Sequence, residues 1–180
     1  SNTWTFPWTV NSSQTGLEIT ATVSGTDMSR NAVSQNTSLT FKISKIYLDS
    51  NGVTVKCPTA NVSDSAVING KQYIVVDEQT LRTRVNNGSD VSCVCTSKVT
   101  NMSLLFKDKT NFNGDMSSWD TSNVVNMQKM FQSSSFTGTS TLSSDVLSYW
   151  DTSSVNDMSY MFSFAASFTG QLSGWDTSNV

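Results

Sequence analysis

The chain has 180 residues and a formal net charge of −3, and only 14% of its residues are charged, whereas about 25% are charged in an average soluble protein. It contains no histidine, which excludes the Ser-His-Asp and Cys-His catalytic systems and histidine-containing zinc sites. Because it has neither a basic stripe to neutralise phosphates nor an apolar run of about 18 residues, we expect neither nucleic-acid binding nor membrane insertion.

Residues 1–45 contain three segments in which apolar and polar residues alternate, a pattern that predicts β-strands. These segments are residues 3–10, 17–23 and 38–43. They resemble the closing strands of the bacterial immunoglobulin-like modules that are strung along long adhesins. Three strands are too few for a seven-stranded sandwich. Either the missing strands precede Ser1, which we favour, or residues 1–45 form a small β-subdomain.

Residues 46–98 predict hairpins, a helix and a capping coil. Two Asn-Gly pairs, at 51–52 and 69–70, lie between strand-like runs and predict hairpin turns. Residues 77–85 predict a short helix with Asp77 as its N-cap, and an Asn-Gly pair follows this segment. We expect the helix to cover the open end of the repeats that come after it.

The three cysteines are Cys57, Cys93 and Cys95. Two cysteines separated by one residue rarely form a disulfide with each other in an extended chain. We therefore expect Cys57 to pair with Cys93 or with Cys95, leaving one thiol free. A structural disulfide is favoured over a zinc site, which would need a fourth ligand.

The second half of the chain is a sequence repeat. The segment Trp-Asp-Thr-Ser occurs at 119–122, 150–153 and 175–178. Before each Trp, the alternation of apolar and polar residues predicts a very short strand. After each segment, a Val opens a new block, and the blocks at 99–106, 124–131 and 155–162 place apolar residues three and four apart, which predicts one face of a short helical turn.

One repeat cannot bury its apolar residues alone, so we expect successive copies to stack with Trp on Trp and Phe on Phe. Residues 90–99 align with residues 115–124 at an offset of 25, but Val94 replaces the Trp, which predicts a capping coil. The spacing from Trp119 to Trp150 is longer than 25 because residues 137–148 contain an insertion.

This repeat closely resembles the BspA-like leucine-rich repeat of about 25 residues that is found in bacterial surface proteins. Residues 112–131 and 168–180 match the family pattern Phe-Asn-x-x-Ile-Ser-x-Trp-Asp-Thr-Ser-Asn-Val-Thr-x-Met-x-x-Met-Phe nearly position by position. The resemblance covers roughly residues 70–180. It implies a mainly β fold in which a leucine-rich-repeat-like solenoid, residues 99–180, follows an N-terminal cap and a partial immunoglobulin-like β-sandwich. Because Val180 would open another repeat, we expect the chain to be part of a longer protein.

Positions that break the repeat pattern are the candidate ligand-binding residues. Tyr149, Tyr160 and Phe164 stand where other copies have Ser, Gly, Leu, Lys or Asp, so we expect them to point outward. Outward aromatic side chains suit carbohydrate stacking or protein contact, although single exposed aromatics also occur without a role. Leu142 and Asp145 in the inserted loop are further candidates, and the loop itself is either a recognition element or a length change with no role.

Asp120, Asp151 and Asp176 recur at one position of the repeat and would stack as an acidic ladder. They could bind calcium, or each could form an Asx-turn with its own Thr-Ser segment. The second interpretation is favoured because Cys95 occupies the equivalent position in the capping coil. We therefore expect no metal and no other cofactor.

We predict a non-catalytic adhesin or ligand-binding repeat segment of a larger secreted bacterial protein, located at the extracellular cell surface. Its partner would be a surface glycan or protein of another cell or host. The alternative is a carbohydrate-binding module of a secreted polysaccharide-processing protein. The remaining carboxylates show no paired spacing typical of an acid/base dyad, so we expect no catalytic residues.

Overall fold

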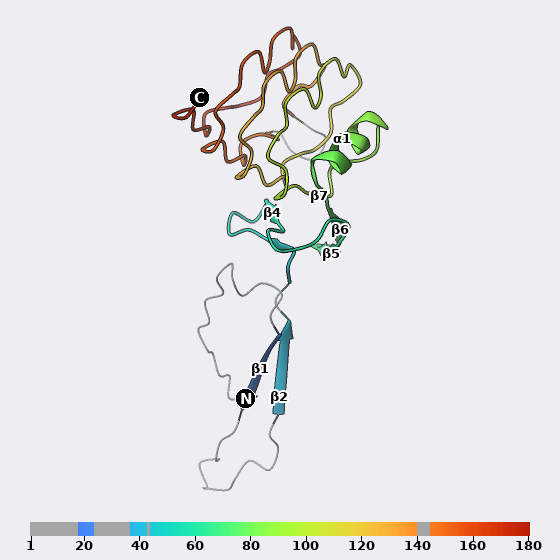
Figure 1. The fold of residues 1–180 in the computed structure, drawn as a ribbon, viewed down its shortest axis with the longest axis vertical. Coiled ribbons are helices and arrows are strands. Elements are labelled where there is room, and N and C mark those ends of the chain that lie inside the picture. Colours follow the sequence, from blue (N-terminus) through green and yellow to red (C-terminus); the bar gives the residue numbers. More distant parts are fainter. Residues whose placement is uncertain (1–17, 24–36, 43, 140–144) are drawn as a thin grey trace, which may run out of the picture. The chain divides into compact units, whose positions relative to one another are not determined.

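The computed structural model describes residues 18–23, 37–42, 44–139 and 145–180. The chain divides into two compact units, Ser1–Lys45 and Ile46–Val180, which are described separately. The described residues form mainly small β-sheets with one short helix (Figure 1), so the prediction of a mainly β fold is confirmed.

In the first unit, β1 (Glu18–Val23) pairs antiparallel with β2 (Thr37–Lys42). Alternating β-branched and polar residues favour such extended pairing. Two of the three strands predicted for residues 1–45 are therefore present. The third, at 3–10, lies outside the described residues.

The second unit begins with two hairpins, as the Asn-Gly pairs predict. Their strands are β3 (Tyr47–Leu48), β4 (Val55–Lys56), β5 (Ser65–Ile68) and β6 (Lys71–Val75). The turn between β5 and β6 has positive φ at both Asn69 (49°) and Gly70 (77°), as the tightest hairpin turns require. A further short strand, β7 (Val94–Cys95), adds parallel to β6 and belongs to the predicted capping coil.

The helix α1 (Glu78–Asn86) follows β6. The carboxylate of Asp77 accepts the N–H of Thr80 at 2.8 Å, as expected of an N-cap. Leu81 and Val85 are buried against the repeats. No helix among the described residues is long and apolar enough to span a membrane.

Three repeats follow, which we define as repeat 1 (99–123), repeat 2 (124–154) and repeat 3 (155–179). Isolated parallel bridges join Asn101 to Asn126 and Asn126 to Asp157, so each repeat lies directly against the next. The stacked backbone is visible as the yellow-to-red part of Figure 1. The expected stacking of copies is thus observed in residues 99–139 and 145–179.

The predicted helical turn after each Val is wrong. Instead, alternate residues use their N–H groups in two ways. The N–H groups of Met102, Leu104 and Phe106 donate to carbonyls of repeat 2 at 2.9 Å each, while those of Leu105 and Lys107 close turns onto carbonyls three residues earlier. A helix cannot form because half of its donors are bonded to the neighbouring repeat.

The predicted short strand before each Trp is also wrong. The N–H of Trp119 donates to the carbonyl of Met116 at 3.1 Å, and Trp150 and Trp175 make the same bond to the leucines three residues before them. Each Trp therefore ends a tight turn. This turn directs the ring inward, although the Trp belongs to none of the β-strands.

Aligned aromatic rings form the core of the stack. The rings of Trp119, Trp150 and Trp175 are 6.1 and 6.3 Å apart and within 6° of parallel. Each indole N–H donates to a carbonyl in the preceding coil of the stack, which is the capping coil for Trp119, at 2.9 to 3.1 Å. This satisfies the only polar group of a side chain that is otherwise completely buried in Trp119.

A second ladder consists of Phe106, Phe131 and Phe162, with ring centroids 5.4 and 5.6 Å apart. The stacking of Trp on Trp and Phe on Phe is therefore as predicted. Burial of such rings supplies the main stabilisation that a single repeat lacks.

Candidate functional site

Each repeat holds two non-glycine residues in the left-handed backbone conformation. They are Leu104, Lys129 and Tyr160 at one position and Asp108, Ser133 and Phe164 at the other, with φ between 54° and 63°. This conformation costs about 1–2 kcal/mol for a residue with a Cβ. Hydrogen bonds between repeats compensate for it, because the N–H of Leu104 donates to Gln128 and that of Lys129 donates to Ser159, each at 2.9 Å.

The side chains at these positions do not fill the core. Leu104 is 47% exposed, Tyr160 66% and Phe164 83%. In repeats 1 and 2 backbone hydrogen bonds to the next repeat, not the side chains, fix this conformation, so the residue type is free to change from one repeat to the next. We call the six residues at these two positions the outer turn surface.

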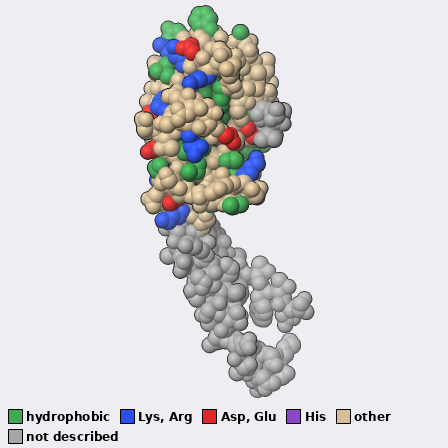
Figure 2. Space-filling model, turned by 90° about the vertical axis from the view of Figure 1, so that its right-hand side faces the viewer, with side chains coloured by type: hydrophobic (Ala, Val, Ile, Leu, Met, Phe, Trp, Pro, Cys, Tyr) green, Lys and Arg blue, Asp and Glu red, His purple; other side chains and the backbone are tan. Residues whose placement is uncertain are grey.

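The outer turn surface combines rings and hydrogen-bonding groups. Lys129 Nζ lies 5.6 Å from the centroid of the Tyr160 ring, a cation–π contact between repeats 2 and 3. The face drawn in Figure 2 shows mostly neutral polar side chains and backbone, with scattered charges. Exposed rings on such a surface can stack on a ligand without a strong electrostatic preference.

Among the predicted site residues, Tyr160 and Phe164 belong to the same turn segment of repeat 3, whereas Tyr149 lies in a different part of its repeat. Tyr149 is 43% exposed beside the buried Trp150. Asp145 is half-buried, and Leu142 lies outside the described residues.

The insertion is anchored at its end. Val146 and Leu147 are completely buried, and the N–H of Val146 donates to the carbonyl of Gly138 at 3.1 Å. The part of the insertion after residue 144 therefore contributes to the core. Tyr149, which follows the insertion, is exposed.

The acidic ladder has Asx-turn geometry. Oδ1 of each aspartate accepts the N–H of the serine two residues later, at 3.2 Å in Asp120, 3.0 Å in Asp151 and 2.9 Å in Asp176. The N–H and hydroxyl of Ser178 hold the pKa of Asp176 below its usual value. The described residues contain no group of three or more His, Cys, Asp or Glu side chains placed to hold a metal ion.

The threonine of the same motif connects the repeats. The hydroxyls of Thr96, Thr121 and Thr152 each donate to the carbonyl of the aspartate in the next repeat, at 2.9 to 3.0 Å. Each residue of the Asp-Thr-Ser motif thus has a structural role, with Asp and Ser closing the turn and Thr joining it to the next one.

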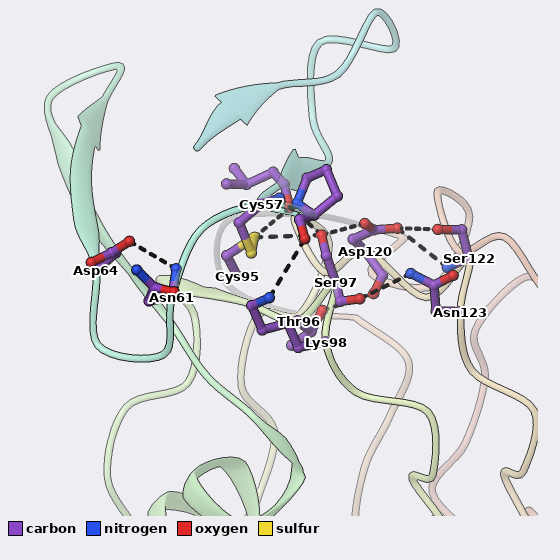
Figure 3. Close-up of a disulfide and its surroundings, with 12 residues drawn as sticks. Cys57, Asn61, Asp64, Cys95, Thr96, Ser97, Lys98, Asp120, Ser122 and Asn123 are labelled. Carbon is purple, nitrogen blue, oxygen red and sulfur yellow. Dashed lines mark hydrogen bonds between the residues drawn. A yellow bond between two sulfur atoms is a disulfide. The ribbon is translucent and has the colours of Figure 1, made fainter. Parts of the chain in front are cut away.

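The predicted disulfide is present and joins Cys57 to Cys95, with Cα atoms 6.2 Å apart (Figure 3). Cys93 is free and half-buried. The hydroxyl of Ser97 accepts the N–H of Cys57 at 2.9 Å and donates to the buried carboxylate of Asp120. The disulfide and this relay together attach the cap to repeat 1.

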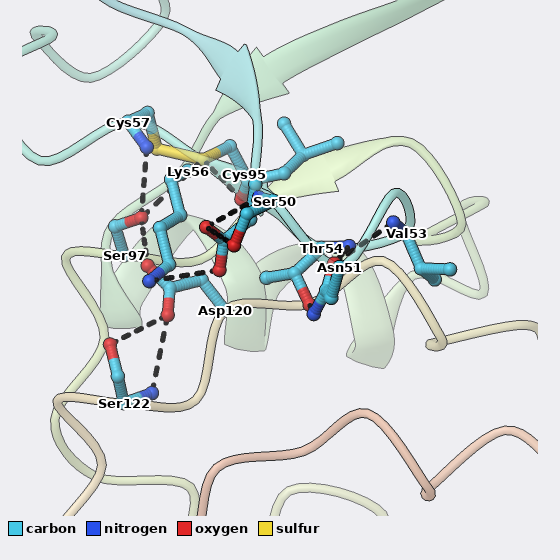
Figure 4. A network of polar contacts seen from close by, with 12 residues as sticks. Ser50, Asn51, Val53, Thr54, Lys56, Cys57, Cys95, Ser97, Asp120 and Ser122 are labelled. Carbon is cyan, nitrogen blue, oxygen red and sulfur yellow. Dashed lines mark hydrogen bonds and ion pairs between the residues drawn. A yellow bond between two sulfur atoms is a disulfide. The ribbon is translucent and has the colours of Figure 1, made fainter. Parts of the chain in front are cut away.

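The hairpin of β3 and β4 adds a polar network on the same side (Figure 4). Lys56 Nζ lies 3.1 Å from the Asp49 carboxylate, and the N–H of Val55 donates to the carbonyl of Ser118 at 2.8 Å. Burial opposes the charged form of Lys56, but the hydrogen bond that Lys56 donates to Asp49 and the charge of Asp120 raise the pKa of Lys56 above its ordinary value.

Sequence reasoning missed two residues that matter for this surface and its support. Lys129, which contacts Tyr160, could have been found by aligning the three repeats and comparing the residues between the recurring Met and Phe positions. Arg82 donates to the carbonyls of Ser103 and Asn101 at 2.9 and 3.1 Å, so it satisfies acceptors of repeat 1 that have no preceding repeat. No sequence motif predicts that role of Arg82.

A protein-family model described as a Mycoplasma protein of unknown function, DUF285, matches residues 78–180. The matched segment begins at the first residue of α1 and includes the capping coil and all three repeats. No curated protein and no solved structure matches the chain.

Proposed function

The chain belongs to the DUF285 family, and we propose that it is a non-catalytic adhesin segment that binds its ligand through the outer turn surface. The ligand is a surface glycan or protein of another cell or host. The segment belongs to a larger secreted bacterial protein and acts at the extracellular cell surface. A structural disulfide and a surface wetted by hydroxyls and amides suit that environment.

We further propose that the stacked repeats are a BspA-like, leucine-rich-repeat-like solenoid, and that β1 and β2 are closing strands of an immunoglobulin-like module. The parallel bridges between repeats and the aligned Trp and Phe rings support the first proposal. The antiparallel pairing of β1 with β2 is compatible with the second.

One observation carries the functional proposal: the outer turn surface has a fixed backbone and changing side chains. Leu, Lys and Tyr occupy one position, and Asp, Ser and Phe occupy the other. A rigid scaffold that presents interchangeable side chains is the arrangement that binding proteins use to acquire ligands. The most exposed hydrophobic side chains on this surface are the aromatic residues Tyr160 and Phe164.

The alternative is a carbohydrate-binding module of a secreted polysaccharide-processing protein. The exposed rings of Tyr160 and Phe164 favour this alternative as much as they favour an adhesin. The two differ in the ligand's location, since a module would bind isolated polysaccharide whereas an adhesin would bind intact cells.

The test uses the full 180-residue chain carrying a fluorescent label. Binding is measured to a glycan array, to insoluble polysaccharides, and to bacterial and animal cells. We expect the double variant Tyr160→Ser, Phe164→Ser to lose at least about tenfold in affinity, as is usual when two aromatic contacts are removed. Tyr149→Ser, which removes an exposed ring elsewhere, is the matched control and should retain binding.

A double variant that is folded and binds as well as the native chain would refute the proposed surface. Binding to isolated polysaccharide without binding to cells would favour the alternative module.

A further inference from the structure

A concave site lies where α1 meets repeat 1, and neither Tyr160 nor Phe164 is among the residues that line it. It is a hollow of about 330 Å³, lined by the end of α1, the turn that follows it, and residues 108–112. This volume is at the small end of the range for ligand pockets, about 300–1,000 Å³. It suits a ligand of one or two sugar rings.

Phe112, which lines the hollow, is the first ring of an aromatic ladder. Phe112 is followed by Phe136 and Phe168, with 6.2 Å between successive centroids, and it also stacks on Phe106 at 3.9 Å. The side of repeat 1 opposite repeat 2 is covered by α1, and α1 contains no aromatic residue. Phe112 is half-buried and lines the hollow, and among the described residues no further ring continues this ladder beyond it.

The rim is polar and nearly neutral. Asn86, Ser89, Thr110 and Asn111 supply amide and hydroxyl groups, and all four residues are exposed. Lys109 Nζ donates to Asn86 Oδ1 at 3.2 Å, which orients the Asn86 amide so that its hydrogens remain as donors. Asp108 is paired with Lys107 at 2.7 Å. The rim therefore has many donors and acceptors, and its two charged residues, Asp108 and Lys109, carry opposite charges.

We propose that this hollow is a binding site for a neutral carbohydrate. The C–H face of a pyranose ring would occupy the next position of the ladder above Phe112. Its hydroxyls would exchange hydrogen bonds with Asn86, Thr110 and Asn111. A purely aromatic ligand would leave these polar groups unused. An anionic ligand would find only Lys109, which is bonded to Asn86, and a cationic ligand would find only Asp108, which is paired with Lys107.

The proposal does not depend on the function assigned to the outer turn surface. Asp108 is the residue common to both, whereas Tyr160 and Phe164 belong to repeat 3. The double variant Tyr160→Ser, Phe164→Ser should therefore leave carbohydrate binding in the hollow unchanged, so the failure of one proposal is distinguishable from the failure of the other.

The test is a titration of the ¹⁵N-labelled full chain, followed by amide chemical shifts. The probes are D-glucose, D-galactose, D-mannose and N-acetyl-D-glucosamine, each raised to about 100 mM because a single ring binds weakly. We expect at least one sugar to cause saturable shifts in the amides of residues 86–89 and 109–112.

Two variants sharpen the test. Asn111→Ala should weaken binding about fivefold, the effect of one lost hydrogen bond, and Phe112→Leu about tenfold through loss of the stacking face. Ser167→Ala, at the position in repeat 3 that corresponds to Asn111, is the matched control and should leave the Kd unchanged. Because Asn111 is exposed, its variant remains informative if Phe112→Leu fails to fold.

The proposal is overturned if none of the four sugars shifts these amides, or if folded Asn111→Ala binds as tightly as the native chain. It is also overturned if phenol saturates the hollow while the sugars do not.

Discussion

The inward and outward positions of the repeats differ in how strictly the residue type is kept, although they share one backbone. The inward position occupied by Trp119, Trp150 and Trp175 keeps one residue type, and its rings stack 6.1 to 6.3 Å apart. The outward position occupied by Leu104, Lys129 and Tyr160 has a different residue in each repeat. Identical inward residues let copies align, and backbone hydrogen bonds between copies leave the outward residues free to change.

The largest effect that this comparison predicts is at an inward position. Trp150 is 2% exposed, lies between two other tryptophans and donates its indole N–H to Met116. Trp150→Ala should lower the free energy of unfolding by about 3–5 kcal/mol because it leaves a cavity between two repeats. Urea denaturation followed by circular dichroism measures this.

The loss should also be local at first. Repeat arrays are stabilised by interfaces between neighbours, so hydrogen exchange should increase first in repeats 2 and 3. Uniform loosening of the whole described part of the second unit would count against this picture. Tyr149→Ala, the neighbouring exposed ring, should change stability by less than about 0.5 kcal/mol.

A smaller loss is expected where the stack begins. Arg82→Met should cost about 2 kcal/mol, because the carbonyls of Asn101 and Ser103 lose a charged donor and have no preceding repeat to bond. Arg84→Met is the matched control on the same helix, since its longer 3.4 Å bond to Asp90 is solvent-exposed. Equal losses in the two variants would mean that Arg82 does not cap the stack.

The connecting threonines should contribute less again. Thr152 is buried, donates to the carbonyl of Asp176 and accepts the N–H of Asp176, both at 2.9 Å. Thr152→Val should therefore cost about 1 kcal/mol. Thr177→Val, at the exposed equivalent position of repeat 3, should cost much less in the same denaturation assay, and a reversed order would contradict the role assigned to the motif.

The Asx-turns predict a modest dependence on acid. The hydroxyl and N–H of Ser159 lower the pKa of Asp157, and the N–H and hydroxyl of Ser178 lower that of Asp176. Because the folded-state pKa values lie below the ordinary value of 3.8, the stabilisation is present above about pH 4 and is lost as the pH falls through the folded pKa. The urea midpoint should therefore decrease below pH 4.

Asp157→Asn separates this effect from general acid unfolding. The difference in midpoint between the native chain and the variant should be largest near neutral pH and should narrow as the pH falls below 4. A difference that does not change with pH would show that the charge of Asp157 contributes nothing.

The sequence carries enough information to predict the elements that depend on local chemistry. Asp77 as an N-cap, the Asn69-Gly70 turn and the stacking of the tryptophans all follow from residue type and spacing, and the structure contains them. The disulfide was predicted only as Cys57 with one of two partners. The choice of Cys95 depends on how β7 lies beside β6, which is a tertiary property.

The backbone between Val and Phe was predicted incorrectly for a physical reason. Apolar residues three and four apart are typical of a helix, but the same spacing places residues inward when alternate N–H groups bond to a neighbouring repeat. Asn123, just before one of these blocks, also bonds outside its own repeat, because its side-chain amide donates to the carbonyl of Ser97 at 2.9 Å. Hydrogen bonds from one repeat to the next cannot be predicted from the residue spacing within a single repeat.

The central claim is that the side chains of the outer turn surface do not stabilise the fold. Its most direct test is the unfolding free energy of the double variant Tyr160→Leu, Phe164→Asp, which gives repeat 3 the outward residues of repeat 1. We predict a value within about 0.5 kcal/mol of the native chain, the usual effect of surface substitutions. A loss of about 2 kcal/mol or more, approaching that expected for Trp150→Ala, would contradict the claim that inward and outward positions are independent.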